Sequence, residues 1–290
     1  MVRLFKSIAI IAGFTLTGCA SLGANITDSS KQRFKDNDFQ QARVINDSAF
    51  IYGNPVWLPK GKQNGGAVIF MAPCPGFQQY NDQDAMKWVH LLTDNGYVVM
   101  PMSINGFGRP DRNCGKNKPL PQERMAKDVF DAANHLAKIP GVNPNKIFAM
   151  GQSLGAMIAT YALREKYVNQ AKEAGWVIPA GAVALYGGCS YKNEDAWLSG
   201  DVTRPVLWMS GTKDVERGTG CNSWLYNSVT KNAPGSEFID YQGATHCWDC
   251  SQLNGWTKKT FFGDQVYTYD PVVTKKSQED TLRFLNKLMD

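Results

Sequence analysis

Histidine is scarce in this chain, with three residues among 290. A histidine-rich metal centre is therefore excluded. The closely spaced Cys247 and Cys250 have no second cysteine pair or nearby histidine pair to complete a four-ligand zinc site. We expect neither a metal nor a cofactor.

Excess charge is also modest. The formal net charge is +5, and lysine and arginine are scattered along the chain instead of forming a basic stripe. A nucleic-acid-binding surface would require such a stripe. We therefore expect no nucleic acid partner.

What the chain has in quantity is apolar sequence, at 43% of its residues. That content and length suffice for one sizeable core. No internal repeat, low-complexity tract or second domain is visible.

The N-terminus has the pattern of an export signal. The apolar run 7–16 follows Arg3 and Lys6 and is too short to span a membrane. The next residues, "LTGC", resemble the lipobox of bacterial lipoproteins, which implies lipidation of Cys19 and a membrane anchor. Ala20 lacks the aspartate of the inner-membrane retention signal, so the resemblance favours the outer membrane, facing the periplasm. An ordinary signal peptide cleaved nearby is the alternative.

These features divide the chain into three parts. Residues 1–18 are expected to be the signal peptide, 19–40 the lipidated N-terminus with a polar tether, and 41–290 one folded domain.

Export changes the expected state of the remaining cysteines. In an oxidising compartment an even set forms disulfides by default, although six cysteines allow 15 pairings. The six residues are Cys74, Cys114, Cys189, Cys221, Cys247 and Cys250.

Apolar runs alternate with helical patterns along the rest of the chain. This alternation predicts a single α/β domain with a mostly parallel central sheet and helices on both faces. Strands are expected in 43–53, 67–73, 97–102, 146–151, 180–188, 205–211 and 237–244. Helices are expected in 84–96, 124–139, 154–168 and 277–289.

Ser153 lies where one of these strands gives way to a helix. It is the serine of Gly151-Gln152-Ser153-Leu154-Gly155, the G-x-S-x-G pattern of a nucleophile elbow. Glycines relieve crowding in the strained turn, and the helix start favours negative charge near the hydroxyl. A plain turn of small residues is the alternative, but the flanking strand and helix favour a nucleophile.

A serine nucleophile needs a base and an orienting carboxylate. His90 and His135 fall within helical patterns, whereas His246 follows the last strand in a loop and is the predicted base. Asp214 follows the preceding strand and is the predicted carboxylate. The alternatives for the carboxylate are Glu216 and Asp249.

The oxyanion of the reaction requires two N–H donors. Leu154 N–H directly follows the nucleophile and supplies one. The other is expected from the loop after the strand at 67–73, where Pro75 has no N–H and Phe77 is the predicted donor.

These motifs together resemble the dienelactone hydrolase group of the α/β-hydrolase superfamily. The resemblance covers 67–288 and rests on "GQSLGA", "GTKD", "YQGATH" and the lead-in to the elbow strand. The namesake enzymes use a cysteine nucleophile and bind a substrate carboxylate with two arginines. Here the nucleophile is Ser153. Arg109 or Arg112 matches the first arginine, but none follows His246 before Lys258. Dienelactone itself is therefore not the expected substrate.

In this architecture the cysteine loops gather at one edge of the sheet, on the face that carries the active site. Neighbouring loops suggest the pairs Cys74–Cys114, Cys189–Cys221 and Cys247–Cys250.

The sequence thus predicts a lipid-anchored serine hydrolase that cleaves small-molecule carboxylic esters or related acyl compounds through an acyl-enzyme. A non-catalytic binding or scaffold lipoprotein on the same fold is one alternative. An acyltransferase or peptidase that uses the same triad is another.

Overall fold

A computed structural model describes residues 43–44, 56–74, 76–77, 82–102, 122–189, 197–218, 220–260 and 263–290. The predicted signal peptide, Cys19, the tether, Arg109, Arg112 and Cys114 lie outside these residues. Within them, no helix combines the length and apolar character needed to cross a membrane.

An eight-stranded sheet forms the centre of the described structure, in the order β1-β2-β4-β3-β5-β6-β7-β8. Strands β1 and β2 are antiparallel to their neighbours, and β4, β3, β5, β6, β7 and β8 are mutually parallel. The bounds are β1 (Arg43–Val44), β2 (Trp57–Leu58), β3 (Ala67–Met71), β4 (Val98–Met102), β5 (Ile147–Gln152), β6 (Gly181–Leu185), β7 (Val206–Gly211) and β8 (Glu237–Tyr241).

The strand sequences are apolar because both faces of the sheet are covered. Along β3, Val68 and Phe70 join one core cluster, while Ala67, Ile69 and Met71 join the other. All five side chains are buried. Because successive side chains of a strand point to opposite faces of the sheet, this one run contributes to both cores.

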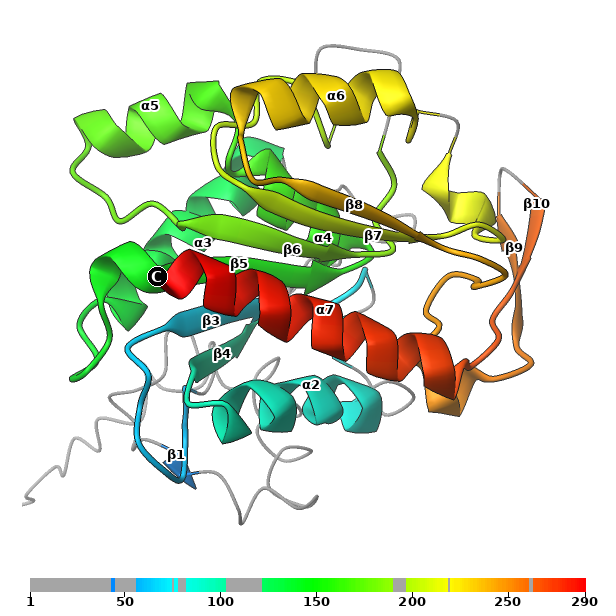
Figure 1. Cartoon of the computed structure of the whole chain (residues 1–290), viewed down its shortest axis with the longest axis horizontal. Coiled ribbons are helices and arrows are strands. Elements are labelled where there is room, and N and C mark those ends of the chain that lie inside the picture. Colours follow the sequence, from blue (N-terminus) through cyan, green and yellow to red (C-terminus); the bar gives the residue numbers. More distant parts are fainter. Residues whose placement is uncertain are drawn as a thin grey trace, which may run out of the picture.

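Helices cover both faces, as predicted (Figure 1). Helices α3 (Gln122–Leu136), α4 (Leu154–Tyr161), α5 (Glu165–Glu173) and α6 (Ser223–Asn232) contribute to one core cluster. Helices α2 (Asp82–Asp94) and α7 (Pro271–Met289) contribute to the other. The predicted single α/β domain with a mostly parallel sheet is confirmed.

The helix predicted over 154–168 is two helices in the structure. Arg164 adopts extended backbone (φ −65°, ψ 146°) and forms a β-bridge with Val202, which interrupts the helix between α4 and α5. Its Nε lies 3.0 Å from each carboxylate oxygen of Asp201. This ion pair fixes the break.

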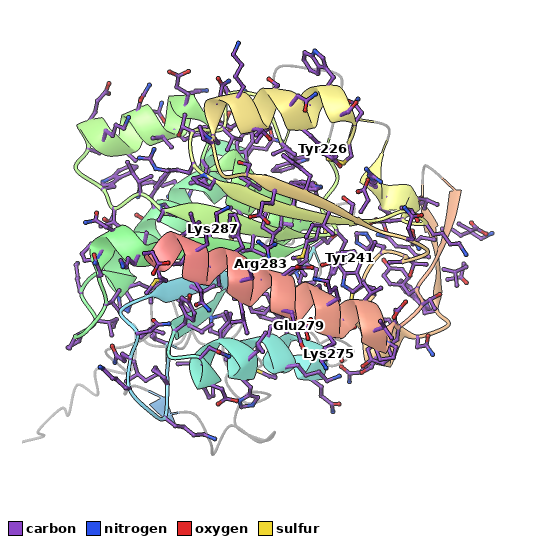
Figure 2. All side chains as sticks on the ribbon, viewed as in Figure 1. Tyr226, Tyr241, Lys275, Glu279, Arg283 and Lys287 are labelled. Atoms are coloured by element: carbon purple, nitrogen blue, oxygen red, sulfur yellow. A yellow bond between two sulfur atoms is a disulfide. The ribbon has the colours of Figure 1, made fainter. Side chains whose placement is uncertain are left out.

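The C-terminal helix begins earlier than the apolar pattern predicts. The Asp270 side chain accepts hydrogen bonds from Val272 N and Val273 N, and Pro271 occupies the first turn. Near its other end, Arg283 and Lys287 pair with Glu237 at the start of β8, at 2.6 and 3.2 Å. Figure 2 shows both basic residues along α7.

A small hairpin precedes α7 and was not predicted. It consists of β9 (Thr257–Thr260) and β10 (Gly263–Val266), which pair antiparallel outside the main sheet. Three 3₁₀ turns complete the described elements: η3 (Pro144–Lys146), η4 (Val215–Arg217) and η5 (Ser251–Leu253).

Candidate active site

Ser153 occupies a strained turn between β5 and α4. Its φ of 51° and ψ of −114° fall outside the ordinary regions for a non-glycine residue. A Cβ on Gly151 would lie 2.2 Å from the carbonyl carbon of Gly155, and one on Gly155 would lie 2.4 Å from the Met71 oxygen. The two glycines are therefore a steric requirement of this elbow.

The turn brings Ser153 into contact with residues far along the chain. His246 Nε2 lies 3.1 Å from Ser153 Oγ, and His246 Nδ1 lies 2.8 Å from Asp214 Oδ2. With the carboxylate accepting from Nδ1–H, Nε2 is left to accept the serine hydroxyl proton. This is the arrangement required of a nucleophile, a base and an orienting acid.

The loop after β7 orients Asp214. Its Oδ1 accepts a hydrogen bond from Glu216 N at 2.8 Å, which caps η4, while Oδ2 faces the imidazole. The Asp214 side chain is fully buried and that of His246 is 6% exposed. The carboxylate is thus held in one orientation and shielded from water.

Several groups around His246 affect its protonation. Burial lowers the pKa of His246, but the charge and hydrogen bond of Asp214 raise it, and Glu216 adds to the rise. Lys258 acts in the opposite direction, and the net pKa lies above the ordinary 6.5. The imidazolium is therefore favoured, as proton transfer from serine requires.

Two aromatic rings pack edge-on against the imidazole of His246. The ring centroids of Tyr186 and Tyr267 lie 5.0 and 5.8 Å from it. Tyr186 follows β6 and has a positive φ of 45°. The sequence analysis missed both tyrosines, because nothing in their neighbourhoods signals contact with a histidine.

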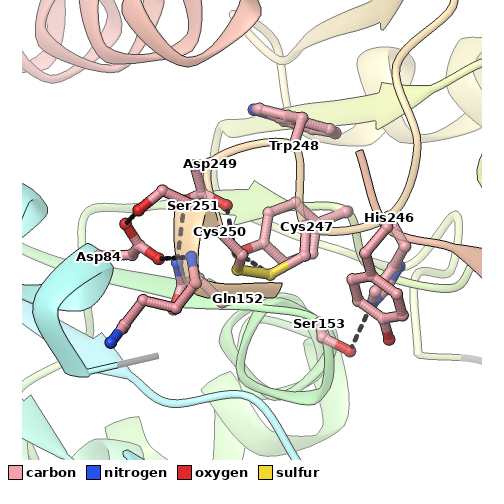
Figure 3. Close-up of a disulfide and its surroundings, with 12 residues drawn as sticks. Asp84, Gln152, Ser153, His246, Cys247, Trp248, Asp249, Cys250 and Ser251 are labelled. Atoms are coloured by element: carbon pink, nitrogen blue, oxygen red, sulfur yellow. Dashed lines mark hydrogen bonds between the residues drawn. A yellow bond between two sulfur atoms is a disulfide. The ribbon is translucent and has the colours of Figure 1, made fainter. Parts of the chain in front are cut away.

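Asp249, an alternative carboxylate in the sequence analysis, is buried on the elbow side of the site (Figure 3). It accepts hydrogen bonds from Trp88 Nε1 at 2.6 Å and from Gln152 Nε2 at 2.9 Å. Burial and the charge of Asp84 raise the pKa of Asp249. These two hydrogen bonds and one with Tyr186 lower it, and the net pKa lies above the ordinary value. Asp249 therefore links the elbow to α2, while Asp214 holds the histidine.

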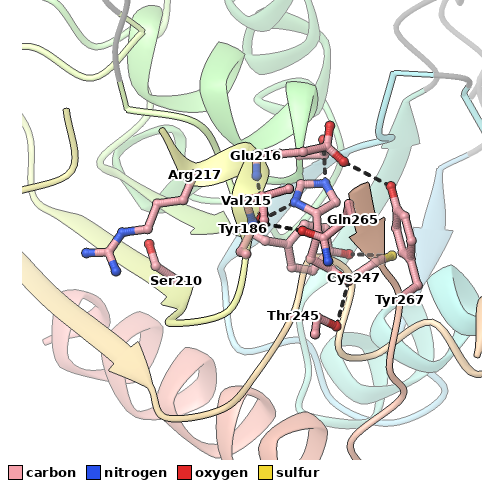
Figure 4. Close-up of polar contacts among 12 residues, drawn as sticks. Tyr186, Ser210, Val215, Glu216, Arg217, Thr245, Cys247, Gln265 and Tyr267 are labelled. Atoms are coloured by element: carbon pink, nitrogen blue, oxygen red, sulfur yellow. Dashed lines mark hydrogen bonds and ion pairs between the residues drawn. The ribbon is translucent and has the colours of Figure 1, made fainter. Parts of the chain in front are cut away.

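Glu216, the other alternative carboxylate, lies in η4 beside the site (Figure 4). Its carboxylate pairs with Lys258 Nζ at 2.7 Å and accepts a hydrogen bond from the Tyr267 hydroxyl at 3.1 Å. Glu216 therefore contacts Lys258 and Tyr267, whereas Asp214 contacts His246. The two acids have separate roles.

Disulfides brace the loops around the site. The structure contains Cys189–Cys221 and Cys247–Cys250, the two pairings predicted for these four cysteines. Cys74 is also disulfide-bonded. The pairing of Cys74 with Cys114 stays a prediction, since Cys114 lies outside the described residues.

Among the residues that the structure describes, one group has metal-ligand spacing. The ligand atoms of Cys247, Asp249 and Cys250 lie within 4.8 Å of one another. The two sulfurs are joined in a disulfide and so are not thiolate ligands.

The predicted oxyanion donors lie on segments that pack together. Leu154 begins α4, and Gly155 packs against the oxygens of Met71 and Ala72, which lead into the loop of Phe77. Phe77 is buried, with its ring 5.7 Å from that of Phe70. The donor roles of Leu154 N–H and Phe77 N–H stay predictions.

Solved structures share this fold at low sequence identity. A dienelactone hydrolase-like promiscuous phosphotriesterase from metagenomic libraries has a TM-score of 0.57 and 15% identity, over 81% of this chain and 92% of that one. A putative dienelactone hydrolase from Klebsiella pneumoniae has a TM-score of 0.54 and 16% identity, over 80% and 92%. Butyrate-bound esterase 2 of Thermogutta terrifontis has a TM-score of 0.58 and 14% identity, over 88% and 96%.

These likenesses agree with the predicted α/β-hydrolase fold. Among curated proteins, no sequence matches the chain. The family model described as "Dienelactone hydrolase family" matches residues 58–289, which include the elbow, the acid loop and the histidine loop. On that match, the chain belongs to the dienelactone hydrolase family.

Proposed function

We propose that this protein is a serine hydrolase that cleaves small-molecule carboxylic esters or related acyl bonds through an acyl-enzyme. The observation that carries the proposal is the hydrogen-bonded chain from Ser153 through His246 to Asp214, built on a strained elbow. Membership of a hydrolase family and the fold of known esterases support it.

In the first half-reaction, Ser153 Oγ attacks the carbonyl carbon while His246 Nε2 takes the hydroxyl proton. The carbonyl electron pair moves to oxygen, where Leu154 N–H and Phe77 N–H stabilise the negative charge. The tetrahedral intermediate then collapses, and His246 gives the proton to the departing alkoxide. The products are an alcohol and an acyl-serine.

In the second half-reaction, water replaces the alcohol. His246 takes a proton from water as its oxygen attacks the acyl carbon, and returns that proton to Ser153 Oγ when the acyl–oxygen bond breaks. Asp214 stays ionised throughout, and it orients the ring and stabilises the imidazolium.

Activity-based labelling tests the proposal. A fluorophosphonate should modify Ser153 and abolish hydrolysis of short nitrophenyl esters, with the label located by mass mapping of peptides. Label on another residue, or esterase activity retained in Ser153→Ala, would refute it. A panel of amides and acyl acceptors run beside the esters distinguishes a peptidase or an acyltransferase.

We propose further that Cys19 is lipidated and anchors the protein in the outer membrane, facing the periplasm. The support is the apolar run before "LTGC" and the polar segment that follows. A palmitate analogue should label the wild-type chain, which should sediment with outer membranes, whereas Cys19→Ala should be unlabelled. Equal labelling of the two chains would contradict the anchor.

A further inference from the structure

Glu216 is an acidic residue beside the triad that the proposed reaction does not use. It lies two positions after Asp214, in η4, and its backbone N–H is bound by the Asp214 carboxylate. The same carboxylate therefore holds both the imidazole of His246 and the turn that carries Glu216. This geometry ties the position of Glu216 to that of the base.

The β9–β10 hairpin contacts η4 at two points, and the residue after it adds a third. Lys258 on β9 forms an ion pair with Glu216 Oε2, and Tyr267, which follows β10, donates its hydroxyl to Oε1. Gln265 on β10, with only 1% of its surface exposed, accepts a hydrogen bond from Val215 N at 2.8 Å through Oε1. Both oxygens of Glu216 and the turn beneath it are thus fixed by the hairpin and by Tyr267 after it. Figure 4 shows the contacts of Tyr267 with Glu216 and of Gln265 with Val215.

His246 is surrounded by a small set of charged and titratable groups. Asp214 contacts it from the loop after β7, and the phenol rings of Tyr186 and Tyr267 pack on it from the segments after β6 and β10. The Tyr267 ring also donates its hydroxyl to Glu216, whose other carboxylate oxygen holds Lys258 of β9, so this ion pair lies one tyrosine side chain away from the imidazole. Because the ring is buried, charge–charge interactions there are screened less than on the surface. The Glu216–Lys258 pair is thus linked to the imidazole twice, through the Asp214 carboxylate and through Tyr267.

We propose that Glu216 is a positioning residue that stabilises the imidazolium form of His246 during acyl transfer, and that Lys258 on the β9–β10 hairpin limits this stabilisation. The inference rests on the proposed function for its catalytic consequence. The negative charge of Glu216 stabilises the proton that His246 gains in the transition state. The ammonium group of Lys258, which pairs with Glu216, reduces this stabilisation.

The experiment measures His246 titration and activity in the same variants of the full chain. NMR follows the imidazole signals, which are tractable because the chain has three histidines. The initial rate of nitrophenyl ester hydrolysis is recorded against pH. Glu216→Gln should move the His246 titration and the rate inflection to lower pH and decrease the high-pH rate. Lys258→Met should move both to higher pH.

Glu237→Gln is the matched control. Glu237 is also a carboxylate held by two basic side chains, but at the start of β8, away from the carboxyl ends that carry the site. The substitution changes net charge equally, so it should leave the titration and the rate inflection unchanged.

The inference is overturned if Glu216→Gln folds with the wild-type His246 titration, or if Glu237→Gln produces the same shift. Should Glu216→Gln fail to fold, Lys258→Met decides the matter, and an unshifted or lowered titration overturns the inference. The NMR readout does not need turnover. A shifted titration in an inactive protein would refute the esterase proposal alone, and an unshifted titration in an active enzyme would refute this inference alone.

Discussion

In the proposed mechanism Ser153 is the nucleophile and Asp214 only orients the base, so the loss of each should lower the rate by a different factor. Ser153→Ala removes the nucleophile and should lower kcat by about 10⁶-fold, whereas Asp214→Asn leaves a misoriented base and should cost about 10⁴-fold. Steady-state kinetics with a short nitrophenyl ester checks both. Ser228→Ala, on α6, is the control and should leave kcat unchanged. An Asp214→Asn variant with near wild-type kcat would contradict the assignment.

The raised pKa of His246 fixes the direction of the pH dependence. In the proposed mechanism the neutral ring is the base, so the rate should rise with pH and reach half its plateau above 6.5. Because the folded-state pKa exceeds the unfolded value, the stability from this group is present below 6.5 and is lost as pH rises through the folded-state pKa. Rate profiles and thermal unfolding against pH check the two trends, and an inflection below 6.5 would contradict them.

The residue types of the site could be predicted because each has a local signal. Ser153 stands between two glycines after an apolar run, and elimination among three histidines left His246. The choice between Asp214 and Glu216 had no comparable signal, since both lie in one loop. Contacts with residues distant in the chain decide it, because Asp214 Oδ2 lies 2.8 Å from His246 Nδ1 whereas Glu216 pairs with Lys258.

At the scale of elements, the elbow depends on close contact between α4 and β3. Gly155→Ala should lower the free energy of unfolding by about 1–3 kcal/mol, because its Cβ would lie 2.4 Å from the Met71 oxygen. It should also reduce activity by displacing Ser153. Thermal unfolding and ester hydrolysis measure these effects.

Gly61→Ala is the control for this substitution, because a Cβ there meets nothing within 4 Å. It should change neither stability nor rate appreciably. Equal stability of the two alanine variants would show that the elbow tolerates a side chain at position 155.

The central strands with a buried apolar run were predictable, and the surface hairpin was not. Every residue of strands β3 to β7 is buried, and each strand is an almost unbroken apolar run in the sequence. Strand β9 reads "TKKT" and alternates between exposed and half-buried residues, so no apolar period marks it. The break at Arg164 was equally hidden, because its partners at the break, Val202 and Asp201, lie far along the chain.

At the scale of the whole molecule, the two described disulfides should have separable effects. Cys189–Cys221 joins residues 32 positions apart and restricts the unfolded chain far more than Cys247–Cys250, which spans three. Replacing Cys189 and Cys221 with alanine should lower the free energy of unfolding by about 3–4 kcal/mol. It should reduce activity less than replacing Cys247 and Cys250 does. Denaturant unfolding of the double variant measures that cost.

Replacing Cys247 and Cys250 with alanine should give the reverse result. The short ring directly follows His246 and encloses Asp249, which holds Gln152 of the elbow, so its opening should disturb the site more than the fold. Activity should fall with little change in the unfolding midpoint, and mild reduction of the wild type should inactivate it before it unfolds. Thiol titration of denatured, unreduced protein provides the reference, because four or more free cysteines would refute the disulfide assignment. A Cys247/Cys250 variant with normal activity and lowered stability would instead show that the ring supports folding and has no part in positioning the histidine.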